Sequence, residues 1–110
     1  ENNAIRLLIQ LSKEFDVRIH IVHLSSADIL SEIAQTRNDG YPISVETCPH
    51  YLHFASENIS DGDTRFKCAP PIWQAKNREN LWRGLEKGMI NFITSDHSPC
   101  TAELKNMEAG

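Results

Sequence analysis

Apolar positions along the chain switch between helical spacing and the short, β-branched runs typical of buried strands. Glycine, proline and small polar clusters separate these stretches and predict where each element ends. At the start of the second helix, Ser25 and Asp28 have the spacing of a capping box. The predicted elements are helices over residues 4–15, 25–38 and 77–87, and strands over residues 17–24, 43–47 and 91–94.

This alternation of helices and strands is typical of βα units on a parallel sheet, so the predicted fold class is α/β. A closed (β/α)₈ TIM barrel needs about 250 residues. The 110 residues would therefore be only part of such a barrel. The chain begins at Glu1 rather than at a methionine, and we expect it to be a single partial barrel domain, a fragment of a longer protein.

The strand predicted over residues 17–24 orients its side chains by its period of two. Ile19, Ile21 and His23 would share one face, so that an aliphatic row ends in an imidazole at the carboxyl edge of the strand. His20 would point to the opposite side, which we predict to be the helix layer, and would have a structural role.

Composition narrows the functional classes. The net charge is −4 and the 11 basic residues form no run, which argues against a nucleic-acid partner. No apolar run is long enough to span a membrane, and no signal-peptide pattern opens the chain. Three widely spaced cysteines favour reduced thiols, and hence an intracellular protein. The sequence does not distinguish cytoplasm, mitochondrion and peroxisome.

A dense polar cluster, residues 95–98, follows the last predicted strand. Asp96 there has two interpretations that the spacing leaves open: a turn in which the carboxylate accepts from a backbone N–H, or a catalytic group at a strand end. Because parallel strands end at one edge of the sheet, His23, His50, Ala69 and Asp96 should emerge together. An imidazole and a carboxylate suit a divalent metal ion that activates water, although a catalytic zinc needs at least three protein ligands.

Four blocks of the sequence resemble the carboxyl-terminal half of the barrel of the cyclic amidohydrolases, and most of all the allantoinase branch. The resemblance implies about the last three to four βα units of a metal-dependent hydrolase barrel. The blocks are His20-Ile21-Val22-His23-Leu24-Ser25-Ser26, Glu46-Thr47-Cys48-Pro49-His50-Tyr51, Lys67-Cys68-Ala69-Pro70-Pro71-Ile72 and Ser95-Asp96-His97-Ser98-Pro99-Cys100.

By this resemblance, His23 matches the last histidine ligand of a centre of two divalent metal ions, expected to be Zn²⁺. Asp96 matches the aspartate that binds one metal and carries the proton. The family's remaining ligands are an HxH pair, another histidine and a carboxylated lysine that bridges the metals. All of them lie earlier in the barrel, outside this chain, and Lys13 does not match the lysine because it sits in a predicted helix.

Other expected site residues contact substrate or support the ligands. Ala69 occupies the position that touches the substrate ring, with Cys68 and His97 beside it. His50 and Ser95 are expected to orient the ligands through hydrogen bonds. Many relatives have a polar residue at position 69, and an arginine where this chain has Trp73, so the substrate contacts depart from the family pattern.

The implied reaction is hydrolysis of the ring amide of allantoin to allantoate, a step of purine degradation, in a homo-oligomer, a tetramer by resemblance. Dihydroorotase and dihydropyrimidinase or hydantoinase share the machinery and are the alternatives within the class. A non-catalytic dihydropyrimidinase-like assembly protein is the alternative of another class, although such relatives typically lose metal ligands that His23 and Asp96 would supply here. A truncated, inactive product remains a third reading.

Overall fold

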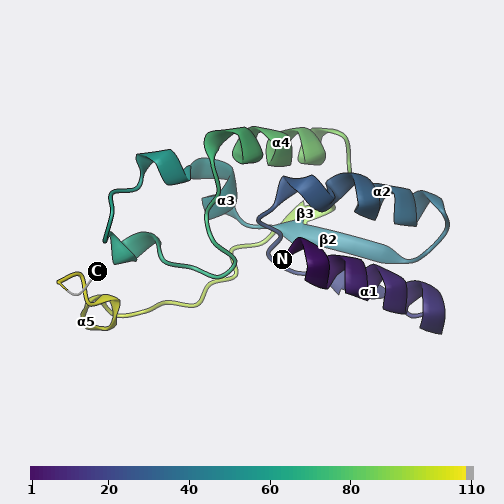
Figure 1. Cartoon of the computed structure of the whole chain (residues 1–110), viewed down its shortest axis with the longest axis horizontal. Coiled ribbons are helices and arrows are strands. Elements are labelled where there is room, and N and C mark those ends of the chain that lie inside the picture. The colour runs from purple at the N-terminus through teal and green to yellow at the C-terminus, as the bar shows by residue number, and fades with distance from the viewer. Residues whose placement is uncertain (109–110) are drawn as a thin grey trace.

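A three-stranded parallel sheet consists of β1 (Ile19–Ile21), β2 (Ile43–Thr47) and β3 (Phe92–Ile93), with β2 in the middle (Figure 1). The computed structural model describes residues 1–108. The α-helices of these residues are α1 (Asn2–Phe15), α2 (Leu30–Asn38), α3 (Pro49–His53), α4 (Ala75–Glu86) and α5 (Ala102–Lys105), and short 3₁₀ helices cover Ala27–Ile29, Ser56–Asn58 and Thr64–Phe66.

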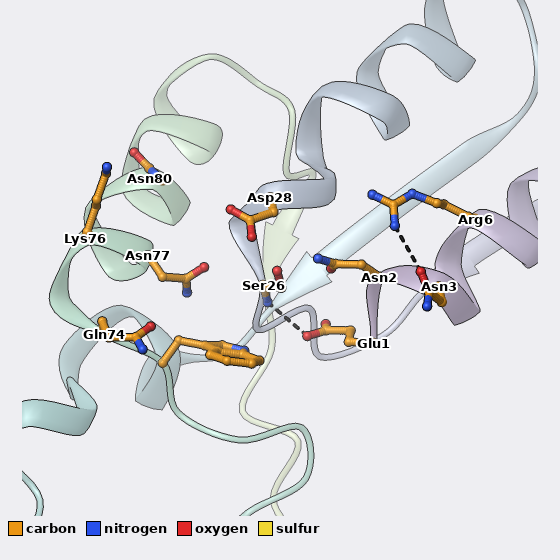
Figure 2. Close-up of a pocket in the computed structure, with 11 residues that line it drawn as sticks. Glu1, Asn2, Asn3, Arg6, Ser26, Asp28, Gln74, Lys76, Asn77 and Asn80 are labelled. Atoms are coloured by element: carbon orange, nitrogen blue, oxygen red, sulfur yellow. Dashed lines mark hydrogen bonds between the residues drawn. The ribbon is translucent and has the colours of Figure 1, made fainter.

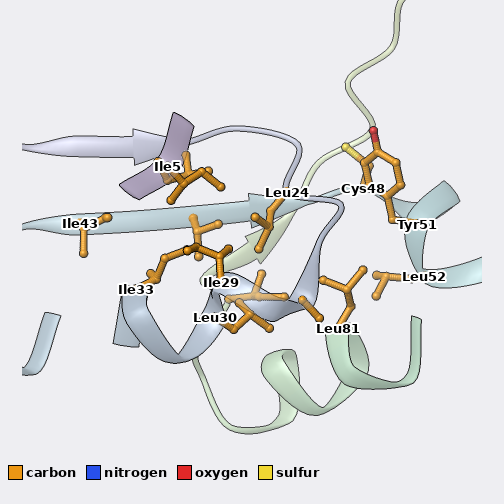
Figure 3. Packing of buried hydrophobic residues seen from close by; sticks show 14 of the residues in the cluster. Ile5, Leu24, Ile29, Leu30, Ile33, Ile43, Cys48, Tyr51, Leu52 and Leu81 are labelled. Carbon is orange, nitrogen blue, oxygen red and sulfur yellow. The ribbon is translucent and has the colours of Figure 1, made fainter. Parts of the chain in front are cut away.

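Helices α1, α2 and α4 pack on the same face of the sheet. Ile19 pairs with Ile43 and Ile21 with Val45 across the first two strands, so these aliphatic side chains form one face. They share a single hydrophobic cluster with the buried residues of α1, α2 and α4 (Figure 3). The fully buried apolar members include Leu24, Ile29, Ile33, Val45 and Leu81. Each such side chain stabilises the fold by about 1.5–3 kcal/mol relative to an exposed one.

His20 lies on the other face, so the prediction that it points toward the helix layer is wrong. Its Nδ1 is 2.8 Å from Ser44 Oγ, and its Nε2 is 2.9 Å from Glu46 Oε2. Its ring stacks on Phe92 at a centroid distance of 5.4 Å. The physical reason is simple: the aliphatic residues on either side of His20 cover the core, so the alternate position must face away from it.

The first strand is also shorter than predicted. Regular pairing stops at Ile21 because His23 has φ of 41°, a left-handed conformation that cannot continue a strand. The capping box is absent as well: Ser25 Oγ instead donates to the Glu1 carboxylate, and the turn Ala27–Ile29 precedes α2. The last strand, predicted over residues 91–94 as a buried strand, is exposed: 49% of the surface of Phe92 is accessible to solvent.

Other boundaries follow the sequence closely. β2 has the predicted bounds, and α1 and α4 start two residues earlier than predicted. Gly40 and Gly88 follow α2 and α4 with positive φ, as a helix-ending glycine should. Helix α3 was not predicted; Pro49 occupies its first turn, where a missing N–H costs nothing. Within residues 1–108, no helix combines the length and the apolar character that crossing a membrane requires.

Candidate active site

Three of the predicted site residues follow the carboxyl ends of the strands. His23 comes two residues after β1, His50 three residues after β2, and Asp96 three residues after β3. Because the three strands are parallel, these ends share one edge of the sheet. In α/β folds this is the edge at which binding and catalytic groups gather.

His23 and Asp96 share an unusual backbone conformation. Their φ angles are 41° and 47°, and only two other residues of the described chain that are not glycine, Asp16 and Asn106, have positive φ. Those two end helices α1 and α5. Left-handed non-glycine residues store strain and concentrate at functional sites. Here the conformation re-aims a side chain directly after a strand.

The His23 imidazole has a polar atom without a partner. Its Nδ1 is buried, and no hydrogen bond to it exists among residues 1–108. Leaving such an atom unsatisfied costs about 1–3 kcal/mol. A buried ring nitrogen of this kind is suited to bind a ligand, and histidine is the side chain that most commonly binds metal ions in proteins.

His50, on α3, lies close enough to the His23 imidazole and the Asp96 carboxylate for both to affect its pKa. Burial is the main cause that lowers its pKa; the Asp96 carboxylate raises the pKa and the His23 ring lowers it. The net effect keeps His50 neutral near pH 7. His23, His50 and Asp96, which come from three different strand ends, therefore form one electrostatic group.

A cavity of about 550 Å³ lies beside this group, within the usual range for small-molecule sites. Among its lining residues are six of the seven predicted site residues: His50, Cys68, Ala69, Ser95, Asp96 and His97. His23 does not line it. Arg65, Lys67 and Lys105 also line the cavity, and they were missed because nothing in their spacing links them to the strand ends.

A larger cavity of about 680 Å³ lies between α1 and α4 (Figure 2). It holds none of the predicted site residues; Trp73 lines it instead, with its indole N–H donating to Ser25 Oγ. We assign the candidate site to the smaller cavity because that one contains Asp96 and lies at the carboxyl ends of the strands.

The thiols near the site are protonated at neutral pH. Burial, followed by the charges of Asp96 and Glu46, raises the pKa of Cys48 to about 11. Burial also raises the pKa of Cys68. All three cysteines are free, and Cys100 is exposed. No cluster of three or more His, Cys, Asp or Glu side chains within residues 1–108 is arranged to hold a metal ion.

Known proteins resemble this chain over nearly all of it. No family model matches the sequence. The allantoinase of Streptomyces avermitilis is 46% identical over 105 residues, which cover 96% of this chain and 24% of that protein. The probable allantoinase of Oryza sativa subsp. japonica is 55% identical over 93 residues, covering 84% of this chain and 18% of that protein. The solved structure of a D-hydantoinase from a Bacillus sp. AR9 matches with a TM-score of 0.87 at 29% identity, over 97% of this chain and 25% of its own.

The chain thus spans between 18% and 25% of the length of these relatives. Its parallel sheet and helices match part of their TIM barrel, which confirms the predicted fold class. Sequence and fold agree on one assignment. By sequence the chain matches part of the allantoinases, and by fold it matches part of the barrel of the amidohydrolase superfamily.

Proposed function

We propose that these residues form part of the catalytic barrel of a metal-dependent allantoinase, which hydrolyses the ring amide of allantoin to allantoate. One observation supports this most: His23, whose buried Nδ1 has no hydrogen-bond partner among residues 1–108, and Asp96 follow the carboxyl ends of β1 and β3, two strands of one parallel sheet. The identities of 46% and 55% to allantoinases favour this ring over those of related enzymes.

The donor set suits divalent metal ions, and zinc in particular. A neutral imidazole and a carboxylate are both good zinc ligands. His23 offers a buried nitrogen that otherwise lacks a partner, and Asp96 lies at the cavity wall. In this proposal, His23 and Asp96 supply two ligands, and the HxH pair, a further histidine and the carboxylated lysine come from elsewhere in the complete protein.

When bound, the two metal ions would lower the pKa of the attacking water and polarise the ring carbonyl. Asp96 would accept a proton from that water while the water oxygen forms a bond to the ring carbonyl carbon. The same carboxyl group would then deliver the proton to the ring nitrogen as the carbon–nitrogen bond breaks. His50, neutral because burial lowers its pKa, would orient Asp96 without competing for the proton. Ser95 would serve the same orienting purpose.

The cavity beside Asp96 would receive the ring. Ala69 and Cys68 would contact it from the loop that follows η3 (Thr64–Phe66), and His97 would contact it from the segment after β3. A small, neutral cyclic ureide fits a cavity of about 550 Å³ with room for flanking water. The complete protein would be an intracellular homo-oligomer, a tetramer by its resemblance to the family.

A hydantoinase or dihydropyrimidinase is the second candidate, because the structural match to a D-hydantoinase has a TM-score of 0.87. That match has 29% identity, well below the identity to the allantoinases. The two candidates differ only in the ring that is opened. Dihydrouracil turnover by the complete protein distinguishes them.

The test is turnover by the complete polypeptide that contains these residues, with and without a metal chelator. We expect hydrolysis of allantoin, little hydrolysis of dihydroorotate or dihydrouracil, and loss of activity on chelation that zinc restores. An Asp96→Asn variant should keep its fold and lose activity by several orders of magnitude. Full activity of Asp96→Asn, or chelator-resistant turnover, would contradict the proposal.

A further inference from the structure

The segment that follows His23 is held by hydrogen bonds from four separate parts of the chain. Leu24 is tied to β2: its N–H donates to the Glu46 carbonyl at 2.8 Å, and its carbonyl accepts from Thr47 Oγ1 at 2.6 Å. Leu24 and Thr47 are both fully buried. These bonds fix the residue next to the candidate ligand onto the middle strand.

Glu1 supplies the second anchor. Its carboxylate accepts from Ser25 N–H at 2.9 Å, from Ser25 Oγ at 2.7 Å and from Ser26 N–H at 3.0 Å. Figure 2 shows this carboxylate aimed at the turn that carries Ser26. Ser25 and Ser26 are themselves buried, so the bonds are shielded from solvent.

Asn77, in the first turn of α4, supplies the third anchor. Its Oδ1 accepts from Ala27 N–H at 2.8 Å, and its Nδ2 donates to the Ser25 carbonyl at 2.7 Å. A single amide group therefore spans the turn on both sides. The fourth anchor is the Trp73 indole N–H, which donates to Ser25 Oγ at 3.0 Å.

His23 itself is held indirectly. Its backbone is left-handed and its Nδ1 has no hydrogen-bond partner among residues 1–108. A strained residue keeps its conformation only when the surrounding structure determines it. Since the ring is not held by a bond of its own at that atom, its direction depends on the backbone of residues 24–27, which the four anchors fix.

We propose that Glu1 and Asn77 are positioning residues for His23: by fixing the backbone of residues 24–27, they hold the imidazole in the direction needed to bind metal. The inference rests on the proposed function, in which His23 is a metal ligand. It assigns a role to two residues that are not proposed metal ligands and do not line the substrate cavity of about 550 Å³.

The alternative is that these bonds only stabilise the start of α2. Zinc affinity separates the two roles, because a residue that only supports the helix would change the melting temperature and leave the affinity of the folded apoprotein unchanged. Removing groups that orient a metal ligand typically weakens metal binding by about 10–100-fold. Since Glu1 and Asn77 act through the backbone, we expect the lower end, about 10-fold.

The test uses the complete protein, stripped of metal and titrated with zinc in a competing chelator. The variants are Asn77→Ala, Asn77→Asp and Glu1→Gln, with His23→Ala as the reference for loss of the ligand. Asn80→Ala is the matched control on α4, since Asn80 lies one turn beyond Asn77 and its side chain accepts a hydrogen bond from Arg83 rather than from the segment after His23. Glu14→Gln is the matched control on α1. Circular dichroism and the melting temperature of each apoprotein report the fold.

We expect about 10-fold weaker zinc binding by the folded apoprotein of Asn77→Ala and Glu1→Gln. The apoproteins should melt at a lower temperature than the controls, because buried partners are left unsatisfied, but keep their circular dichroism, and kcat should recover in excess zinc. Zinc affinity equal to that of Asn80→Ala would overturn the inference. Loss of fold in all three variants, including Asn77→Asp, which keeps the acceptor for Ala27 N–H, would also overturn it. If instead the wild type binds no zinc, or His23→Ala binds it unchanged, the proposed function itself fails.

Discussion

Arg37 joins three parts of the chain, and its removal gives a prediction with a magnitude that follows from the structure. From the last turn of α2, the guanidinium donates to the start of β2 and to the turn that leads into β3. Its acceptors are the carbonyls of Ile43 at 3.2 Å, Gly88 at 3.1 Å and Met89 at 3.1 Å, and Asn91 Oδ1 at 3.0 Å. The same Asn91 oxygen accepts from Val45 N–H at 2.9 Å, so the network also sets the spacing of β2 and β3.

The perturbation is Arg37→Met, which keeps much of the aliphatic stem and removes every donor. A hydrogen bond to a charged group contributes about 1.5–3 kcal/mol. Arg37 is only half-buried, and water can replace some of the lost donors, so we take about 0.5–1 kcal/mol for each bond. With four bonds, the free energy of unfolding should fall by about 2–4 kcal/mol.

The assay is urea unfolding followed by circular dichroism, comparing midpoints at an unchanged slope. Arg83→Met is the control, since Arg83 makes one long contact, to Asn80 at 3.3 Å, and should change stability by less than about 0.5 kcal/mol. Arg37→Lys should recover only part of the loss, because an ammonium cannot reach four acceptors at once. Equal midpoints for Arg37→Met and Arg83→Met would refute the reasoning.

Three further predictions follow from packing and from the pKa values. In Gly84→Ala the new Cβ would lie 2.6 Å from Leu30 Cδ1. This crowding should destabilise the protein by about 1–3 kcal/mol, more than the gain of about 1 kcal/mol from the better helix propensity of alanine. The urea midpoint should therefore fall, and a higher midpoint would contradict the prediction. At pH 8, Cys48, with a pKa of about 11, should react with iodoacetamide at least about 100-fold more slowly than the exposed Cys100. Mass spectrometry measures the two rates, and equal rates would contradict the burial of Cys48. Burial lowers the pKa of His50, so below about pH 6.5 the unfolded chain binds more protons at this residue than the folded chain does. The contribution of neutral, buried His50 to the free energy of unfolding is therefore complete above about pH 6.5 and is lost as the pH falls below it. His50→Asn should flatten the loss of stability between pH 7 and 5, and an unchanged profile would count against this assignment.

Elements whose core-facing side chains recur at a regular spacing, such as β2 and α4, were predictable from the sequence. In β2, Ile43, Val45 and Thr47 are buried and alternate with half-buried residues, so apolar spacing marks both ends of the strand. In α4, Leu81 is fully buried and Gly88 ends the helix. Local pattern is sufficient for such elements because burial of one face determines them.

The strand before His23 was misjudged because pattern alone cannot show where pairing stops. A run of β-branched residues continues to Val22, yet the left-handed backbone at His23 ends the strand early. The direction of His20 was wrong for a related reason. Parity separates two faces, but only the position of the helices shows which of them is the core.

The contacts that hold the candidate site were not predictable at all. Ser25 meets Glu1 across 24 residues of sequence, and Ala27 meets Asn77 across 50. Such pairs depend on how the helices dock, which no local pattern encodes. The resemblance to the family could identify His23 and Asp96 as candidates, but it could not show what positions them.

The central claim is that His23 and Asp96 bind the same metal centre. The most direct measurement is a crystal structure of the complete protein grown with zinc, with anomalous scattering recorded at the zinc absorption edge. We predict zinc peaks at about 2.0–2.2 Å from a ring nitrogen of His23 and from a carboxylate oxygen of Asp96. Zinc bound elsewhere, with both side chains beyond coordination distance of every peak, would contradict the account.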